Sequence, residues 1–366
     1  MINLLNITSI DLMTLLSEIS PLLLLSGFLS VLILCVIILA SQKWHLIYSS
    51  DTDIGPQKIH SNQIPRIGGI ALLAGLLTAY ILKLPFAAGL LIGVLPVFLA
   101  GISEDISKKI PPFFRLGASI VSAIALVWVL SLQISAKGIP LLDTLFSIEI
   151  IALSITALAI ALMAQSINII DGLNGLSIGT SLIMTFAIAI IALINGDFAL
   201  AEFSLFFVAC LAGILVINFP RGLLFLGDGG AYLLGCVIAV LAILLAERNS
   251  SVSSFASLLI VSYPIYETLR SFIRRTIDKN TDFFIADDQH LHSIMYRFIS
   301  NLNSTSTAKP NKLWATNAFA GMSCWLLPLL SSVLAVLFQS SMPVLLICVV
   351  LIILVYETAI RILAKS

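Results

Sequence analysis

Two neighbouring carboxylates, Glu104 and Asp105, stand at the end of a long apolar stretch of the chain. Adjacent negative charges repel each other, so the pKa of one carboxylate rises unless a cation lies nearby. Such a pair suits a divalent metal ion or a group that accepts a proton during catalysis. A solvated helix end is the simpler alternative. We favour a functional role, because the pair lies at membrane level and not inside a long polar loop.

Asn168, Asp171 and Asn174 interrupt hydrophobic sequence at intervals of three residues, next to two glycines. Residues three apart share one face of a helix, so Asn168 and Asp171 would point the same way. A capping turn would account for any single member of this set, but it accounts poorly for all three. The spacing therefore predicts a polar site at this turn.

A further carboxylate, Asp228, lies among three glycines at the start of an apolar stretch. Glycines leave room for an ion that keeps part of its water shell. Mg²⁺ is usually held in this way, by one or two carboxylates together with phosphate oxygens of a substrate. Gly-Asp-Gly is also a common turn, so the motif alone is weak. As one of several acidic sites, it predicts a metal site at Asp228.

Basic and histidine side chains occur in two further polar loops, one before and one after the acidic motifs. These residues are Lys58, His60, Arg66, His290 and His292. We interpret these residues as contacts for phosphate groups. Arg66 precedes a Gly-Gly pair at a helix start, and a helix start favours an anion. Ordinary basic residues that flank a membrane span are the alternative. The two final histidines could instead be zinc ligands. A zinc site would need further ligands, which His60 and His45 would have to supply. Near the end of a later apolar stretch, we expect a structural ion pair combined with anchoring at the membrane edge, and we favour anchoring. These residues are Glu267, Arg270, Arg274 and Arg275.

The chain that carries these groups is very hydrophobic. Of its 366 residues, 59% are hydrophobic and 10% are charged, whereas soluble domains carry about 25% charged residues. About eleven stretches approach the length of roughly 20 residues that crosses a bilayer. They lie near residues 21–41, 67–83, 86–102, 116–134, 150–167, 176–194, 200–217, 231–246, 253–270, 315–337 and 342–363. Unpaired backbone groups are excluded from lipid, and barrel strands would alternate in polarity. We therefore predict an all-α, polytopic integral membrane protein with a single domain, residues 1–366.

The basic residues are distributed unevenly among the loops. Of the 19 Lys and Arg residues, all but Lys83, Lys137 and Arg248 fall in one alternate set of loops. The basic side of a membrane protein faces the cytoplasm. We therefore predict a cytoplasmic site, an N-terminus outside and a C-terminus inside. The net charge of zero excludes a strongly basic protein that binds nucleic acid.

Five of these motifs, taken in order, resemble the polyprenyl-phosphate N-acetylhexosamine-1-phosphate transferases, glycosyltransferase family 4. The motifs are Lys58-Ile-His60 with the loop to Gly69, Glu104-Asp105, Asn168 to Leu176, Phe-Leu-Gly-Asp228-Gly-Gly and His290-Leu-His292, within residues 53–292. The resemblance implies transfer of an N-acetylhexosamine-1-phosphate from a UDP-amino sugar to undecaprenyl phosphate, with release of UMP. It implies a multi-pass protein of the bacterial inner membrane that initiates O-antigen or other surface polysaccharide synthesis. Members of the family also suggest a homodimer.

The resemblance implies catalytic roles for the four acidic residues Glu104, Asp105, Asp171 and Asp228. Asp228 would be the ligand of Mg²⁺, with Mn²⁺ as the alternative ion. Glu104 and Asp105 match the family's Asp-Asp pair, the proposed base and its partner at the lipid phosphate. Because this chain has a longer side chain at the first position, a base role suits Asp105 better than Glu104.

The matched positions also imply contacts with the substrates. These residues are Lys58, His60, Arg66, Asn168, Asn174, His290 and His292. Besides Glu104, two further departures from the family pattern stand out, since Asn174 replaces an acidic residue and Ser293 replaces the last histidine. The identity of the amino sugar stays open, because GlcNAc, QuiNAc and FucNAc all fit.

A multi-pass transporter with a charged site that faces the cytoplasm is the alternative from another class of protein. Transporters place charged residues near the bilayer midplane on broken helices, commonly in two related halves. In this sequence the acidic residues lie at the ends of apolar stretches, and no matching halves are found. We therefore favour the enzyme.

Overall fold

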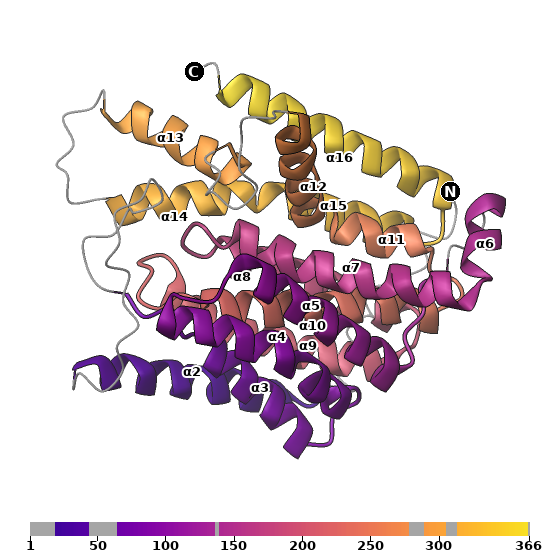
Figure 1. Ribbon diagram of the computed structural model, residues 1–366, viewed down its shortest axis with the longest axis horizontal. Coiled ribbons are helices and arrows are strands. Elements are labelled where there is room, and N and C mark those ends of the chain that lie inside the picture. Colours follow the sequence, from indigo (N-terminus) through magenta and orange to yellow (C-terminus); the bar gives the residue numbers. More distant parts are fainter. Residues whose placement is uncertain (1–18, 44–63, 136–138, 278–288, 305–312, 365–366) are drawn as a thin grey trace.

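The structure is a computed structural model that describes residues 19–43, 64–135, 139–277, 289–304 and 313–364. In these residues every regular element is an α-helix (Figure 1), which confirms the predicted all-α, polytopic class. The helices are α2 (Pro21–Lys43), α3 (Gly69–Ile81), α4 (Ala87–Ser107), α5 (Pro112–Leu130), α6 (Pro140–Phe146), α7 (Glu149–Ile170), α8 (Leu176–Ile194), α9 (Phe198–Asn218), α10 (Gly227–Arg248), α11 (Ser254–Ile260), α12 (Ser262–Ile277), α13 (Leu291–Ser304), α14 (Leu313–Cys324), α15 (Leu326–Phe338) and α16 (Met342–Leu363).

The number of membrane-length helices differs from the expected count of about eleven. Within the described ranges, nine helices are long and apolar enough to cross a membrane. The stretch near 67–83 forms α3, which has only 13 residues. The stretch near 253–270 forms two helices that meet at Val261, with Pro264 in the first turn of α12. Because proline has no N–H to donate, it favours a helix start at this position.

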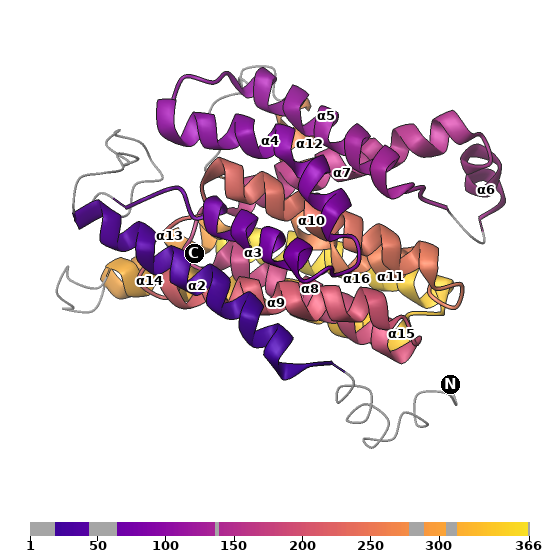
Figure 2. The same cartoon turned by 90° about the horizontal axis from the view of Figure 1, so that it is seen from below.

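The central helix of the bundle is α10. Every residue of its membrane-length window is buried, and Figure 2 shows it between the pair α4 and α5 and the pair α2 and α9. Its first turn packs backbone against backbone, since a methyl group at Gly101 of α4 would overlap with Gly229. A methyl group at Gly69 of α3 would overlap with Gly230 in the same way. Small residues let helices approach closely in lipid, so α3 and α4 hold the start of α10.

Asparagine side chains tie the loops together near the start of α10. Asn218 donates from Nδ2 to the carbonyl oxygen of Leu224 at 2.7 Å. Asn174 donates from Nδ2 to the carbonyl oxygen of Pro220 at 2.9 Å and from its backbone N–H to Asn317 Oδ1 at 2.7 Å. The α7–α8 turn, the α9–α10 loop and α14 are therefore joined at one end of the bundle.

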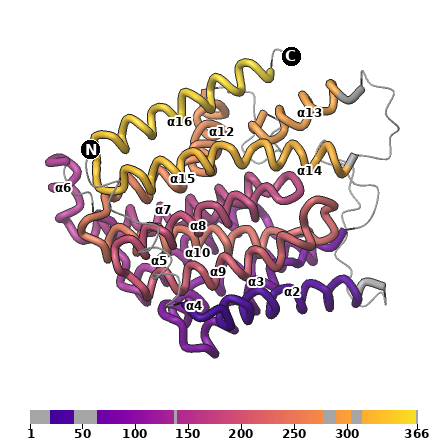
Figure 3. The backbone as a smooth tube through the Cα atoms, turned by 180° about the vertical axis from the view of Figure 1, so that it is seen from behind, coloured from indigo at the N-terminus to yellow at the C-terminus, as the bar shows by residue number. Residues whose placement is uncertain are grey.

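The two ends of the bundle carry different elements. Figure 1 shows α13 at one end and α6 at the other, and Figure 3 shows α2 and α16 on opposite sides. At the α6 end, Asp197 precedes α9 and accepts hydrogen bonds from Arg248 Nε and Nη2 at 2.7 and 2.8 Å. This ion pair joins the α8–α9 turn to the last turn of α10.

Candidate active site

The first turn of α10 carries Asp228, whose carboxylate is contacted from three other segments. Arg115 of α5 forms an ion pair with it through Nη1. Asn168, in the last turn of α7, donates from Nδ2 to Asp228 Oδ1 at 3.1 Å. Arg66, which precedes α3, places Nη2 at 3.7 Å from the same oxygen. Residues that are far apart in the sequence therefore meet at one carboxylate.

Asp105, near the end of α4, binds the backbone at the start of α10. Its Oδ1 accepts the N–H of Asp228 at 2.8 Å, and its Oδ2 accepts the N–H of Gly229 at 3.0 Å. The first N–H groups of a helix lack partners inside the helix, and they favour a negative charge. Asp105 is only 5% exposed. Because both oxygens bind α10, this geometry favours a positioning role over the base role that the sequence suggested.

Gly227 makes this arrangement possible. It has a φ of 72°, in the left-handed region that favours glycine. A methyl group there would also stand 2.5 Å from Asp105 Oδ2 and would overlap with the carbonyl oxygen of Arg66. The glycine before Asp228 is therefore required for the close approach of α4 and the segment before α3.

Glu104 lies in a more open environment than Asp105. Its side chain is half-buried, and its Oε2 accepts the backbone N–H of Ile110 at 2.7 Å. Its charge also acts on Arg115, the partner of Asp228. Of the two neighbouring acids, Glu104 is thus the one whose carboxylate is not engaged by α10.

Asp171 follows the last residue of α7 and accepts a hydrogen bond from the Ser177 hydroxyl. Burial raises the pKa of Asp171 to about 6, while the Ser177 bond and the charge of Arg66 lower it and the charge of Asp228 adds to the rise. The residue as a whole is half-buried. A carboxyl group with a pKa near 6 exchanges its proton close to neutral pH.

Two histidines at the start of α13 lie against the same turn. The rings of His290 and His292 are stacked, with centroids 5.4 Å apart and planes 5° from parallel. A methyl group at Gly172, next to Asp171, would stand 2.6 Å from His292 Nε2. Both histidines are buried. The structure therefore places the last predicted motif, His290 and His292, next to the turn that carries Asp171.

Glu267 and Arg270 of α12 take different partners in the structure. Glu267 Oε1 lies 2.9 Å from His290 Nδ1, whereas Arg270 Nε pairs with Glu357 Oε1 of α16 at 2.8 Å. Residues three apart on a helix can pair, but Glu267 faces the bundle interior and is 1% exposed. The buried face of α12 thus turns the carboxylate toward α13.

The remaining predicted residues divide into two groups. Lys58 and His60 lie outside the described residues. Asn174 is fully buried, and its described hydrogen bonds hold loops together.

Arg115 and Glu267 were not among the predicted site residues. The signal that could have found Arg115 is its place three residues inside a membrane-length helix, where a charge is expensive without a partner.

The donor set at Asp228 fits Mg²⁺ only if substrate oxygens complete it. Among the residues that the structure describes, no three His, Cys, Asp or Glu side chains lie close enough to form a metal site of their own. One carboxylate with phosphate oxygens and water is a usual Mg²⁺ environment. The contact of Arg115 with Asp228 shows that the carboxylate binds cationic groups in this position. Asp228 is therefore the residue that would hold the ion.

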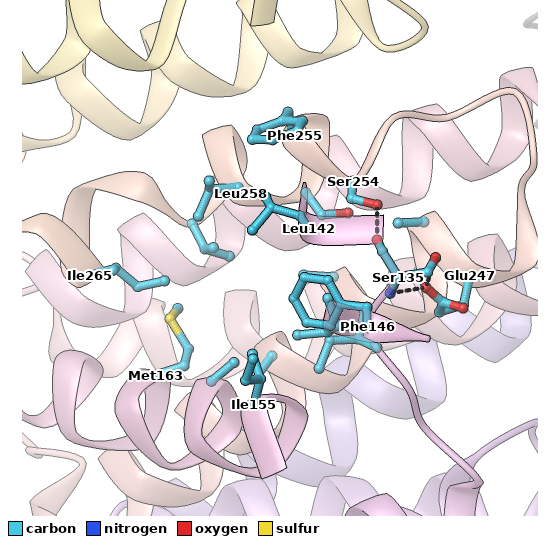
Figure 4. A pocket seen from close by; sticks show the side chains of 18 residues that line it. Ser135, Leu142, Phe146, Ile155, Met163, Glu247, Ser254, Phe255, Leu258 and Ile265 are labelled. Carbon is cyan, nitrogen blue, oxygen red and sulfur yellow. Dashed lines mark hydrogen bonds between the residues drawn. The ribbon is translucent and has the colours of Figure 1, made fainter. Parts of the chain in front are cut away.

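A separate cavity of about 350 Å³ lies between α6, α7, α10 and α11 (Figure 4). Phe146, Met163 and Leu258 are among the apolar side chains that line it. At its rim, Glu247 Oε1 accepts the backbone N–H and the hydroxyl of Ser135 at 3.0 and 2.8 Å. The lining suits hydrocarbon and not the charged groups of a nucleotide, and none of the predicted site residues within the described ranges lines it.

The model of glycosyl transferase family 4 matches residues 87–246. A Bacillus subtilis protein provisionally named an undecaprenyl-phosphate N-acetylglucosaminyl 1-phosphate transferase is 29% identical over 250 residues, 66% of this chain and 68% of the relative. A Thermotoga maritima protein named an undecaprenyl-phosphate alpha-N-acetylglucosaminyl 1-phosphate transferase is 26% identical over 246 residues, 66% and 72% of the two chains. A Sulfolobus acidocaldarius protein provisionally named a UDP-N-acetylglucosamine–dolichyl-phosphate N-acetylglucosaminephosphotransferase is 30% identical over 239 residues, 60% and 71%.

The fold and the site define a polytopic, all-α membrane protein with a cluster of carboxylates and arginines where its helices end. The matched segment contains Glu104, Asp105, Asn168, Asp171 and Asp228. The chain belongs to glycosyl transferase family 4, the polyprenyl-phosphate N-acetylhexosamine-1-phosphate transferases.

Proposed function

We propose that this protein transfers an N-acetylhexosamine-1-phosphate from a UDP-sugar to undecaprenyl phosphate and releases UMP. The observation that carries this proposal is the meeting of Arg115, Asn168 and Arg66 at the carboxylate of Asp228. Phosphoryl transfer depends on positioning and charge neutralisation more than on covalent chemistry by the protein. The names of the relatives support a lipid phosphate as the acceptor.

In the proposed reaction, an oxygen of the lipid phosphate forms a bond with the β-phosphorus of the UDP-sugar. The bond between that phosphorus and the oxygen that bridges the two phosphates breaks, and the oxygen leaves with the electron pair as part of UMP. A proton on the attacking phosphate must go to a base. Glu104 is our candidate for this base, because both oxygens of Asp105 bind the N–H groups of α10.

The charges of the phosphates require cationic partners. Arg115 and Arg66 lie at Asp228, and the imidazoles of His290 and His292 lie at the neighbouring turn. When bound at Asp228 with substrate oxygens, Mg²⁺, or Mn²⁺ as the alternative, would neutralise phosphate charge. Arg115 and Asn168 hold the Asp228 carboxylate at the position where the ion would bind.

We further propose that the site faces the cytoplasm of the bacterial inner membrane, where a soluble nucleotide sugar meets a lipid-bound phosphate. The uneven distribution of Lys and Arg supports this orientation. The product would start O-antigen or another surface polysaccharide, and a homodimer is the proposed assembly. Labelling of single cysteines introduced at Lys109 and Asp143 in intact cells tests the orientation, because only the Asp143 position should react with an impermeant reagent.

The activity can be tested with purified protein in vesicles that contain undecaprenyl phosphate. Mg²⁺ and a panel of UDP-sugars with labelled N-acetylhexosamines are added, and lipid-soluble label and free UMP are measured together. The proposal predicts equal amounts of both products with at least one sugar. Folded protein that yields neither product with any sugar would count against the transferase and would favour the transporter.

A further inference from the structure

A buried carboxylate, Glu267, lies behind the two histidines of the site. It is 1% exposed, and a single oxygen makes two contacts with the start of α13. Oε1 lies 2.9 Å from His290 Nδ1 and accepts the backbone N–H of Leu291 at 3.0 Å. One acid of α12 therefore fixes both the ring of His290 and the backbone that follows it.

We propose that Glu267 is a positioning residue that sets the orientation and proton placement of His290 and, through the stacked ring of His292, holds both imidazoles against the turn of Asp171. The chain of contacts is continuous. Glu267 binds His290, the two rings are stacked, and His292 lies against Gly172 next to Asp171. The kinetic part of this inference rests on the proposed transfer reaction.

The chemistry of the pair follows from the two nitrogens of imidazole. A carboxylate next to Nδ1 keeps a hydrogen on that nitrogen, so Nε2 is the nitrogen that gains or loses the second proton. A neighbouring negative charge also favours the protonated ring. A protonated ring in turn suits a phosphate ligand. Glu267 would thus hold His290 in the tautomer and the charge state that suit a phosphate group.

Other titratable and charged groups surround this pair. On neighbouring elements they are Tyr263 and Arg270 of α12, His292 of α13, Cys324 of α14, and Tyr356 and Glu357 of α16. Tyr263, Cys324 and Tyr356 are neutral at ordinary pH, and Arg270 is paired with Glu357. Among the described groups, Glu267 is therefore the negative charge in direct contact with His290.

NMR of protein with ¹⁵N-labelled histidine tests the proposal without any substrate. The chain has only four histidines, so His290→Gln identifies the His290 signals. The wild-type spectrum should show hydrogen on Nδ1 in the neutral ring. In Glu267→Gln the amide can also donate to Nδ1, so hydrogen should appear on Nε2 in a measurable fraction of the neutral rings. A wild-type neutral ring with hydrogen on Nε2, or the same tautomer in both proteins, would overturn the proposal even if the transferase activity is present.

Kinetics of the same variants provide a second readout. In Glu267→Gln, kcat/KM should fall about 10-fold or more at pH 8. The deficit should shrink at pH 6, because acid favours the charged imidazole that the carboxylate otherwise stabilises. Glu267→Asp keeps the charge, so its activity loss should not depend on pH. Glu357→Gln is the matched control, since it removes a neighbouring carboxylate that pairs with Arg270, and its pH profile should match the wild type.

A pH-independent loss in Glu267→Gln would mean a purely structural role and would reject the proposal. If Glu267→Gln does not fold, the Glu267→Asp spectrum decides, because a neutral His290 ring with hydrogen on Nδ1 is then required. If no variant and no wild-type protein transfers sugar phosphate, the proposed function fails, whereas the NMR result still decides the role of Glu267.

Discussion

Asp105 and Asp228 are joined through the backbone, since the carboxylate of Asp105 accepts the N–H of Asp228 at 2.8 Å. The end of α4 and the start of α10 thus form one unit, and the Asp228 side chain is left to interact with Arg115 and Asn168. The two carboxylates have different tasks in this arrangement. Asp105 fixes the helix start, and Asp228 faces the proposed ligands.

Replacement of Asp105 by alanine should reduce both stability and activity. Two buried N–H groups of α10 would lose their partner, at about 1–3 kcal/mol each. Glu104→Gln should instead lower activity and leave the unfolding temperature in detergent close to the wild type, because Glu104 accepts the half-buried N–H of Ile110 and not the N–H groups of α10. Equal unfolding temperatures for the Asp105→Ala and Glu104→Gln proteins would contradict the positioning role of Asp105.

Replacement of Asp171 by asparagine should stabilise the protein at neutral pH while it lowers activity. The folded-state pKa of about 6 lies above the ordinary value, so the folded protein binds the proton more tightly than the unfolded chain. The contribution of this group to stability is therefore greatest at acid pH and declines as the pH rises toward 6. Thermal unfolding at pH 3.5 and pH 7.5, with chelator present, should show a gain for Asp171→Asn at the higher pH and little or none at the lower. A gain of equal size at both values would refute the raised pKa.

Gly101→Ala should disrupt the site through packing alone. The added methyl group would overlap with the backbone of Gly229 and push α4 away from α10, at about 1–3 kcal/mol or more. Gly117→Ala in α5 is the matched control, because nothing lies within 4 Å of the new methyl group. The control should be neutral or more stable by about 0.5–1 kcal/mol. Unfolding temperatures and transfer rates of both proteins test this prediction.

At the far end of the bundle, Arg248→Ala should lower stability by about 1–2 kcal/mol without a specific effect on transfer. Burial opposes the charge of Asp197, but hydrogen bonds from Arg248 and from the N–H of Leu200 hold the pKa of that carboxyl below its ordinary value. Its stabilising contribution is thus present above the ordinary pKa and is lost as the pH falls through the lower folded-state value. The difference between Arg248→Ala and wild type should be smaller at pH 3 than at pH 7. A large loss of transfer at full stability would instead link this end to catalysis.

The helical class and the ranges of most helices could be predicted from the sequence, because lipid requires long apolar helices. The count of spans could not, since the short α3 and the break at Val261 depend on packing against neighbouring helices. Apolar length alone does not distinguish one membrane-length helix from two shorter ones.

The acidic members of the site could also be predicted, because carboxylates at the ends of apolar stretches are rare and costly. Their individual environments could not. The capping by Asp105 requires the close approach of Gly101 and Gly229, which joins residues more than 120 positions apart. Glu267 could not be predicted for the same reason. Its partner His290 is 23 positions further along the chain, after a segment outside the described residues.

The most direct measurement of the central claim is transfer of labelled sugar phosphate by Asp228→Asn beside Asp143→Asn. Both variants remove one carboxylate, but Asp143 lies in α6 at the opposite end of the bundle. With equal amounts of folded protein in undecaprenyl phosphate vesicles, Asp228→Asn should lose at least about 100-fold in rate, and Asp143→Asn should match the wild type. Wild-type turnover by Asp228→Asn would contradict a site built around that carboxylate.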